Sequence, residues 1–136
     1  MAITAAVCNS FKGEVLAGTH VAADVYKIAL YVSAASLDAT TTAYTATNEV
    51  ANGNGYATLG QTLTGFSAST VGGVGVLDFT TDPSWAASTI TAAGALIYNS
   101  SKSNKAVAVL SFGGNISSTS GTFNVAFSGS GVVNLT

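Results

Sequence analysis

His20 is the one histidine of the chain and the first residue to consider for acid–base chemistry. A histidine that activates a nucleophile needs a nearby carboxylate to orient its ring, and Asp24, four residues later, is the candidate that the sequence offers. His20 also follows Gly18-Thr19, a pair typical of the end of a helix. We therefore interpret His20 as a loop or capping residue rather than a catalytic base.

Asp78 and Asp82, in the stretch LDFTTDPSW, form the only close pair of carboxylates. A glycosidase holds two carboxylates about 5–10 Å apart in a cleft, and calcium could use the same side chains together with backbone carbonyls. The alternating oxygen ligands of a calcium loop are missing, however, and an aspartate before Pro83 is typical of a turn. The sequence predicts turn-forming aspartates at the end of a strand, and a small enzyme using this pair stays as an alternative.

The remaining residues give little chemistry. Cys8, the single cysteine, lies on an apolar stripe and is interpreted as a small buried hydrophobe rather than a thiolate nucleophile. One cysteine and one histidine cannot complete a four-ligand zinc site without several carboxylates. The GGVG stretch at 72–75 is followed by neither a helix nor a GK[ST] motif, so it predicts a hairpin turn rather than a phosphate loop. We expect no catalytic, metal-binding or cofactor-binding residue, and hence no enzyme.

Two of the four basic residues, Lys102 and Lys105, lie in one polar gap within GALIYNSSKSNKAVAVLSF. The gap could be an active site, a patch for an anionic partner or a turn. Strand patterns at 95–99 and 105–112 flank it, which predicts a hairpin whose lysines keep the tip solvated and oppose edge-to-edge pairing. Lys27, in the middle of another predicted strand, is expected to point to solvent; a buried lysine beside an asparagine and a carboxylate could instead form an isopeptide bond.

One helix is predicted ahead of the strands. Apolar residues recur at spacings of four from Ile3 to Val15, which predicts a helix over 3–17 that ends at Gly18. Phe11 lies at the centre of this stripe and is expected to anchor the helix against a sheet.

Short runs rich in β-branched and aromatic residues follow, separated by Gly, Ser and Asn turns. They predict a mainly β fold, a β-sandwich or small barrel of short antiparallel strands with one N-terminal α-helix, in a single domain over 1–136. Segment 36–60 is expected to be a long loop, and Trp85 to lie in a loop after Pro83. The predicted strands are 24–33, 56–65, 66–71, 75–80, 95–99, 105–112, 122–127 and 132–136, the last two joined by a turn at 128–131.

The composition narrows the function classes. Charged residues make up 7% of the chain and the mean hydropathy is +0.46, against roughly 25% charged residues in ordinary soluble domains. No apolar run approaches the roughly 20 residues of a spanning helix, so we expect no membrane protein. The first residues lack a basic region and an unbroken apolar core, which predicts no signal peptide and, with a lone cysteine, synthesis in cytoplasm. Four lysines against six acidic residues argue against nucleic-acid binding.

Self-association is predicted from the surfaces that need cover. In the 95–112 hairpin both strand faces are apolar, so both must be covered, one by the core and the other by the helix or another subunit. Residues 106–136 also lack the charges that keep strand edges monomeric. The candidate interface residues are Phe11, Lys102, Lys105, Val132, Val133 and Leu135.

Three segments resemble a family of small tailed-bacteriophage virion proteins: GALIYNSSKSNKAVAVLSFG, DVYKIALYVS, and TTTAYTATNEV leading to NGNGY. Members of this family begin with a short helix, carry a VYKIALY-like strand and end with an ALIYN…NKAVAVL hairpin, so the resemblance covers roughly residues 7–112. It implies a structural protein of the virion, assembled in the host cytoplasm. Specifically, it implies a capsid decoration or cement protein that binds the major capsid protein or another virion protein, as a trimer on three-fold positions of the capsid.

A second hypothesis is a tail, neck or fibre component. Such a module would recognise host-surface glycans through exposed aromatic side chains, and Tyr44, Tyr56 and Trp85 are the candidates. An exposed aromatic cluster would favour this role, a concave pocket holding both Asp78 and Asp82 would favour the enzyme, and a close-packed oligomer with neither would favour the capsid role.

Overall fold

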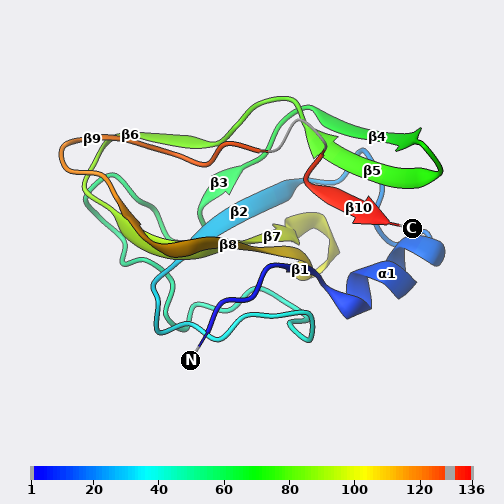
Figure 1. The fold of residues 1–136 in the computed structure, drawn as a ribbon, viewed down its shortest axis with the longest axis horizontal. Coiled ribbons are helices and arrows are strands. Elements are labelled where there is room, and N and C mark those ends of the chain that lie inside the picture. Colours follow the sequence, from blue (N-terminus) through cyan, green and yellow to red (C-terminus); the bar gives the residue numbers. More distant parts are fainter. Residues whose placement is uncertain (1, 128–130, 136) are drawn as a thin grey trace.

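The computed structural model describes residues 2–127 and 131–135, and it confirms the mainly β fold class with one helix near the N-terminus. Figure 1 shows the arrangement. The elements are β1 (Ala6–Val7), α1 (Asn9–Leu16), β2 (Tyr26–Tyr31), β3 (Gln61–Thr62), β4 (Phe66–Val71), β5 (Val74–Phe79), β6 (Ser84–Ser88), β7 (Thr91–Asn99), the 3₁₀ turn η1 (Ser100–Lys102), β8 (Lys105–Ser117), β9 (Gly121–Asn124) and β10 (Val133–Leu135).

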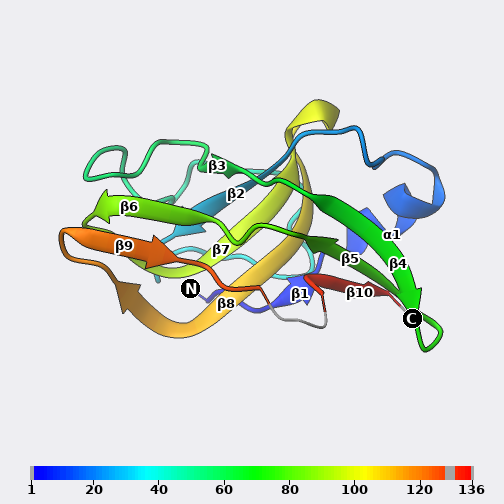
Figure 2. The same ribbon diagram turned by 90° about the horizontal axis from the view of Figure 1, so that it is seen from above.

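Three layers are visible in Figure 1. The middle layer is a five-stranded sheet in the order β1-β8-β7-β2-β3. Two smaller sheets, β10-β5-β4 and β6-β9, lie side by side over one face, as Figure 2 shows from above. The long segment 32–60 runs beneath the other face. The core therefore has a β-sandwich on one side and a layer of irregular chain on the other.

The two sides of the sandwich are joined by one long hairpin. Strands β6 and β7 pair with β9 and β8, and between them Ile90 and Ser118 exchange backbone hydrogen bonds of 3.2 and 2.8 Å. The hydroxyl groups of Ser88 and Ser118 are buried at this bend and lie 2.9 Å apart. Because these groups are paired where the hairpin bends, it can cross from one layer to the other without leaving them unsatisfied.

Strands β9 and β10 do not pair with each other, which corrects the predicted final hairpin. Strand β9 pairs with β6 and β10 pairs with β5, so the last two strands belong to different sheets. The predicted turn at 128–131 falls largely on residues 128–130, which lie outside the described residues.

The predicted helix over 3–17 is too long at its start. Ala6 and Val7 pair with β8, and Ile3 forms a bridge with Leu37, so the first half of the apolar stripe is extended chain. The helix ends as predicted, at Gly18, whose φ of +77° suits a residue without a side chain. Phe11 is 1% exposed and lies in the core, as expected for an anchor.

Segment 32–60 covers the face that the sequence assigned to the helix or to another subunit. The Val50 amide donates to the Leu30 carbonyl of β2, and the Ala106 amide of β8 donates to the Thr42 carbonyl. The segment is thus tied to two strands of the central sheet. Ala35, Leu37 and Tyr56 from this segment are fully buried. The second apolar face of the β7–β8 hairpin is therefore covered within one chain.

Two other predictions were wrong in detail. Of the predicted strand at 56–65, two residues form β3. Residues 56–60 belong to the long segment, and residues 63–65 link β3 to β4. Trp85 lies in β6 rather than in a loop and is 4% exposed, with its ring 6.0 Å from that of Tyr56 and 6.1 Å from that of Phe123. Within the described ranges, none of the helical stretches has the length and apolar character to cross a bilayer.

Candidate functional site

The tip of the β7–β8 hairpin is bound to the chain that leads from α1 into β2. The backbone amide and hydroxyl of Ser100 both donate to the Val25 carbonyl at 2.9 Å, and the Val25 amide donates to the Ser101 hydroxyl at 2.8 Å. The expected turn is present as η1, but it packs onto a neighbouring segment rather than projecting freely.

Lys102, expected to be a solvated tip residue, forms an ion pair. Its Nζ lies 2.9 Å from both carboxylate oxygens of Asp24, whose side chain is 9% exposed. Hydrogen bonds from Lys102 and then Asn99 lower the pKa of Asp24 from 3.8 to about 2. Asp24 is thereby held ionised and fixes the hairpin tip.

Asn99 sets the tautomer of His20. Its Oδ1 accepts from the Ser101 amide at 3.0 Å and its Nδ2 donates to Asp24 at 2.8 Å, so the orientation of the side-chain amide is determined by its neighbours. The same Nδ2 lies 3.0 Å from Nδ1 of His20, which must therefore accept. The proton is on Nε2, which donates to Glu14 at 2.9 Å. His20 is held as the neutral ring, 2% exposed at its side chain.

The carboxylate that orients His20 is thus Glu14 on α1, and not Asp24 as the sequence suggested. Asp24 reaches the ring only through Asn99. With both ring nitrogens in hydrogen bonds, His20 has no free lone pair with which to take a proton from a substrate. Its role in this arrangement is to connect α1 to the hairpin tip.

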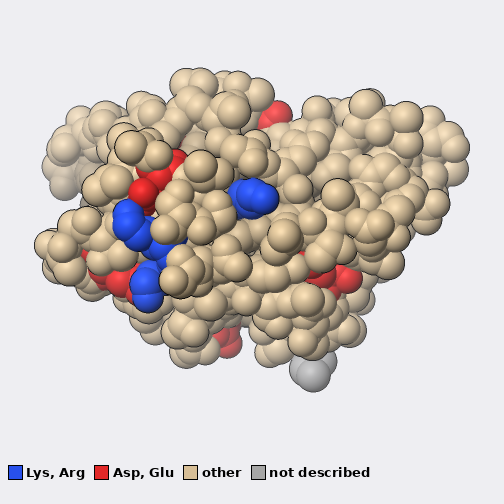
Figure 3. Space-filling model, turned by 180° about the vertical axis from the view of Figure 1, so that it is seen from behind, with Lys and Arg blue, Asp and Glu red and all other residues tan. Residues whose placement is uncertain are grey.

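Lys105 extends this group, since its Nζ lies 3.8 Å from the second oxygen of Glu14. Figure 3 shows that basic and acidic atoms gather together on one part of the surface. We refer below to these connected residues as the charged cluster: Glu14, His20, Asp24, Asn99, Lys102 and Lys105.

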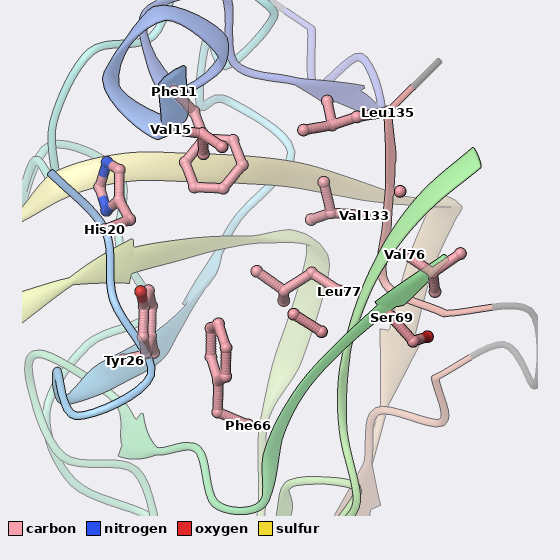
Figure 4. A pocket seen from close by; sticks show the side chains of 12 residues that line it. Phe11, Val15, His20, Tyr26, Phe66, Ser69, Val76, Leu77, Val133 and Leu135 are labelled. Carbon is pink, nitrogen blue, oxygen red and sulfur yellow. The ribbon is translucent and has the colours of Figure 1, made fainter. Parts of the chain in front are cut away.

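An apolar pocket of about 210 Å³ lies beside the charged cluster, between α1 and the β10-β5-β4 sheet. Figure 4 shows Phe11 and Val15 facing Val133 and Leu135, with His20 at one side. The rings of Phe11 and His20 are 4.8 Å apart. Tyr26 and Phe66 line another wall with ring centres 5.1 Å apart. The pocket suits an apolar group.

The two titratable side chains on the pocket wall, Tyr26 and His20, are already engaged. The Tyr26 hydroxyl donates to the Val21 carbonyl at 3.0 Å, and burial raises the pKa of Tyr26 to about 12. His20 is occupied as described above. The pocket therefore offers surface for packing and no acid or base ready for chemistry.

The structure brings most of the predicted interface residues to this region. Phe11, Val133 and Leu135 meet across the pocket, and Phe11 and Val133 are each 1% exposed, so these two pack inside the protomer. Lys102 and Lys105 belong to the charged cluster. Val132 is half-buried near Val109 of β8. The sequence suggested that the final strand would be left unpaired, but in the structure this strand, β10, pairs with β5.

Sequence reasoning missed a second polar cluster, centred on Glu49. Its two carboxylate oxygens accept from the hydroxyls of Tyr44 and Tyr56, each at 2.5 Å, and one of them also accepts from the Leu59 amide at 2.9 Å. Burial, and then the hydrogen bond to Glu49, raise the pKa of both tyrosines above the usual range. These bonds pin segment 32–60 to the sheet, because the Tyr56 hydroxyl also accepts from the Leu30 amide of β2. A lone acid in a stretch containing tyrosines was the available signal.

The aromatic residues proposed for glycan binding are not exposed. Tyr56 and Trp85 are 2% and 4% exposed, and the half-buried Tyr44 packs against Tyr98 with ring centres 5.0 Å apart. An aromatic platform for sugars needs accessible rings, so these three residues do not form one.

The two aspartates act separately. Asp78 accepts from the Phe79 amide at 2.8 Å, and Asp82 accepts from the Phe127 amide at 3.1 Å. The surface hollow that Asp78 lines does not include Asp82. The sequence predicted turn-forming aspartates at a strand end. Asp78 lies within β5, one residue before its end, and Asp82 lies in the link between β5 and β6.

Cys8 is fully buried, as predicted, and burial raises the pKa of its thiol to about 11. Over residues 2–127 and 131–135, no three His, Cys, Asp or Glu side chains lie close enough together to hold a metal ion. Lys27, expected to point to solvent, is half-buried.

Comparison with known proteins found no similarity from which a family could be assigned: no family model, no curated protein and no solved structure matches the chain.

Proposed function

We propose that this protein is a structural component of a tailed-phage virion, a capsid decoration or cement protein that binds the outer capsid surface and stabilises the particle. The supporting observation is that the three segments with the virion-protein resemblance form one unit. DVYKIALYVS contains β2, and the hairpin motif at 94–113 contains the end of β7 and the first part of β8. In the central sheet β7 lies between β2 and β8. The third segment contains Tyr56, whose hydroxyl accepts from the Leu30 amide of β2 and donates to Glu49 of the same segment.

The use of the polar side chains also supports a structural role. His20, Asp24 and Glu49 each hold one part of the chain against another, with their hydrogen-bonding atoms engaged. A particle protein needs a rigid body that survives outside the cell, and buried polar networks with every partner in place favour a single arrangement. The low charge of the chain suits tight contact with a capsid, because few ions must lose water on binding.

Self-association is part of this proposal, with three copies expected from the resemblance alone. The second apolar face of the β7–β8 hairpin gives no reason for self-association, since segment 32–60 covers it. What supports it now is exposed apolar surface: Leu16, Val71 and Ile116 are 90%, 64% and 48% exposed. Isolated exposed residues are common, so the oligomeric state has to be measured.

The deciding experiment is cryo-electron microscopy of purified particles of the phage that encodes the chain, together with mass spectrometry of the same particles. We expect density for this sandwich on the outside of the capsid, in contact with the major capsid protein. Density at the neck, tail or fibre would replace the capsid assignment by the alternative. Absence of the chain from purified particles would contradict a virion role altogether.

A further inference from the structure

The outer edge of β4 is an accessible main-chain surface of the sandwich. In the part of the chain that the structure describes, β4 pairs only with β5 and forms the outer strand of the β10-β5-β4 sheet. Residues 67–71 are exposed, and Val71 is 64% exposed. A six-residue edge strand of this kind is a template for pairing with another strand.

The register of the β4–β5 hairpin shows which backbone groups face outward. Gly72 and Gly73, with φ of +57° and +82°, form the two-residue turn, so Val71 and Val74 next to it are a hydrogen-bonded pair. Because hydrogen-bonded and non-hydrogen-bonded pairs alternate, the N–H and C=O groups of Phe66, Ala68 and Thr70 point away from β5. The outer edge therefore carries three donors and three acceptors at alternate residues.

This edge lacks the usual protection against pairing. Natural edge strands carry lysines, prolines or inward charges, whereas residues 50–77 contain no charged residue and no proline. The nearest charge across the hairpin is Asp78, which is opposite Ser67 on the neighbouring strand. Two such edges can therefore approach without like charges facing one another.

We infer that two copies of this chain pair antiparallel through their β4 edges, about a two-fold axis at Ala68. In this register Ala68 faces Ala68 of the second copy and Phe66 faces Thr70, so all the outward backbone groups of both strands meet. Each facing pair exchanges two hydrogen bonds, and the two three-stranded sheets become one continuous sheet. A shift by two residues in either direction would take one of these pairs off the strand.

The side chains agree with this register. Ser67 faces Ser69 of the second copy in a close, non-hydrogen-bonded pair, where the two hydroxyls can bond to each other. The most exposed apolar side chain of the strand, Val71, lies opposite Gly65, which has no side chain to obstruct it. A second copy therefore suits the edge along its whole length, which is why we favour it over an unrelated strand.

The contact is independent of the virion role. Because it joins two protomers, it stands as the alternative to the three copies that the virion resemblance implies. Sedimentation equilibrium of the purified chain at micromolar concentration is expected to give twice the 13.4 kDa mass. The decisive variant is Ala68→Pro, which removes an outward N–H that β5 does not use. Proline is accepted at such an edge position, so the fold should remain and the dimer dissociation constant should rise at least tenfold. Ala68→Val keeps the amide and should remain dimeric.

Disulfide cross-linking tests the same β4–β4 contact without a proline substitution. In the inferred register the two Ala68 Cα atoms lie about 5.5 Å apart, within the range for a disulfide. Ala68→Cys should therefore cross-link under mild oxidation, while Val71→Cys, whose two copies are about 20 Å apart, should not. The native Cys8 is fully buried and does not compete.

A monomeric wild-type chain would overturn the inference. So would a dimer or trimer whose mass is unchanged by Ala68→Pro, or cross-linking of Val71→Cys as efficient as that of Ala68→Cys. Loss of the dimer with Ala68→Pro but not with Ala68→Val, together with selective cross-linking at position 68, would support it.

Discussion

The α1 end of the molecule and the β4–β5 hairpin differ in how many charged residues they carry and in which contacts hold them in place. At the α1 end, four of the ten charged residues are joined with His20 and Asn99 in one network. The β4–β5 hairpin carries a single charge, Asp78, and is held to the rest mainly by β10 and by packing of Phe66, Leu77 and Phe79. The charges at the α1 end join separate segments, whereas β4 carries no charge along its outer edge.

This difference between the two regions shows that the charged side chains at the α1 end fix neighbouring segments to one another. A loop or short helix without a ladder of hydrogen bonds needs specific side-chain contacts to stay in place. A hairpin with a regular ladder does not, so its surface is free to make contacts elsewhere. Four predictions test this contrast.

The largest effect is expected for Phe11→Ala. Phe11 is 1% exposed between α1 and the second layer, so its truncation should lower the free energy of unfolding by about 3–5 kcal/mol. The matched change on the hairpin is Val71→Ala, where the side chain is 64% exposed and the expected change in the protomer is within about 0.5 kcal/mol. Urea titration of both variants at low protein concentration gives the comparison. A cost below about 1 kcal/mol for Phe11→Ala would place α1 outside the core.

Glu49→Gln should have the next largest effect. One side-chain oxygen is replaced by a donor, so at least one of the two tyrosine hydroxyls loses its acceptor at a cost of about 1–3 kcal/mol. Amide hydrogen exchange should increase in segment 32–60 and stay unchanged in the β4–β5 hairpin. Glu49→Asp is the control that retains the charge. Equal acceleration in both regions would show global destabilisation and contradict a local pin.

The Asp24–Lys102 pair should give a pH dependence in acid. The pKa of Asp24 is lowered in the folded protein from 3.8 to about 2, so the unfolded state binds the proton more readily. Its contribution to stability is complete above the unfolded value near pH 4 and is lost as the pH falls toward 2. Asp24→Asn should remove this part of the acid dependence, with Asp82→Asn as the control. Urea titrations between pH 2 and 6 measure it; identical slopes for wild type and Asp24→Asn would contradict the proposed role.

The smallest effect is expected for the lysines. Lys102→Ala together with Lys105→Ala should lower the free energy of unfolding by no more than about 1 kcal/mol. The two lysine side chains are 35% and 41% exposed, and ion pairs of exposed side chains are weak. Lys102 should account for most of the loss, because its Nζ lies 2.9 Å from the Asp24 carboxylate, whereas Nζ of Lys105 lies 3.8 Å from the Glu14 carboxylate. Denaturant titration of the single and double variants tests the order. A loss of several kcal/mol would show that the cluster is a main source of stability.

Patterns carried by neighbouring residues were readable in the sequence. Strands β2, β4, β7 and β8 are rich in β-branched, aromatic and small residues and lie between Gly, Ser and Asn turns. These preferences act within a few residues. The two-residue turn at Gly72-Gly73 and the helix end at Gly18 follow from backbone angles that glycine adopts easily. Burial of Phe11 and Cys8 followed from their place on an apolar stripe.

Only the tertiary structure decided how those elements combine. The spacing from Ile3 to Val7 fits a helix, but β8 and Leu37 offer backbone partners, so the chain there is extended. Trp85 became part of a strand because β9 lies beside it, and the final strands joined different sheets because the β6–β7 and β8–β9 strands bend between layers. His20 gained its role from Asn99, 79 positions away in the sequence. The partners of Glu49 are near in sequence, but they fix it to the sheet because Tyr56 also binds Leu30 of β2. Local preference determines which segments can be strands, whereas strand partners and polar contacts depend on which distant groups the packed core brings together.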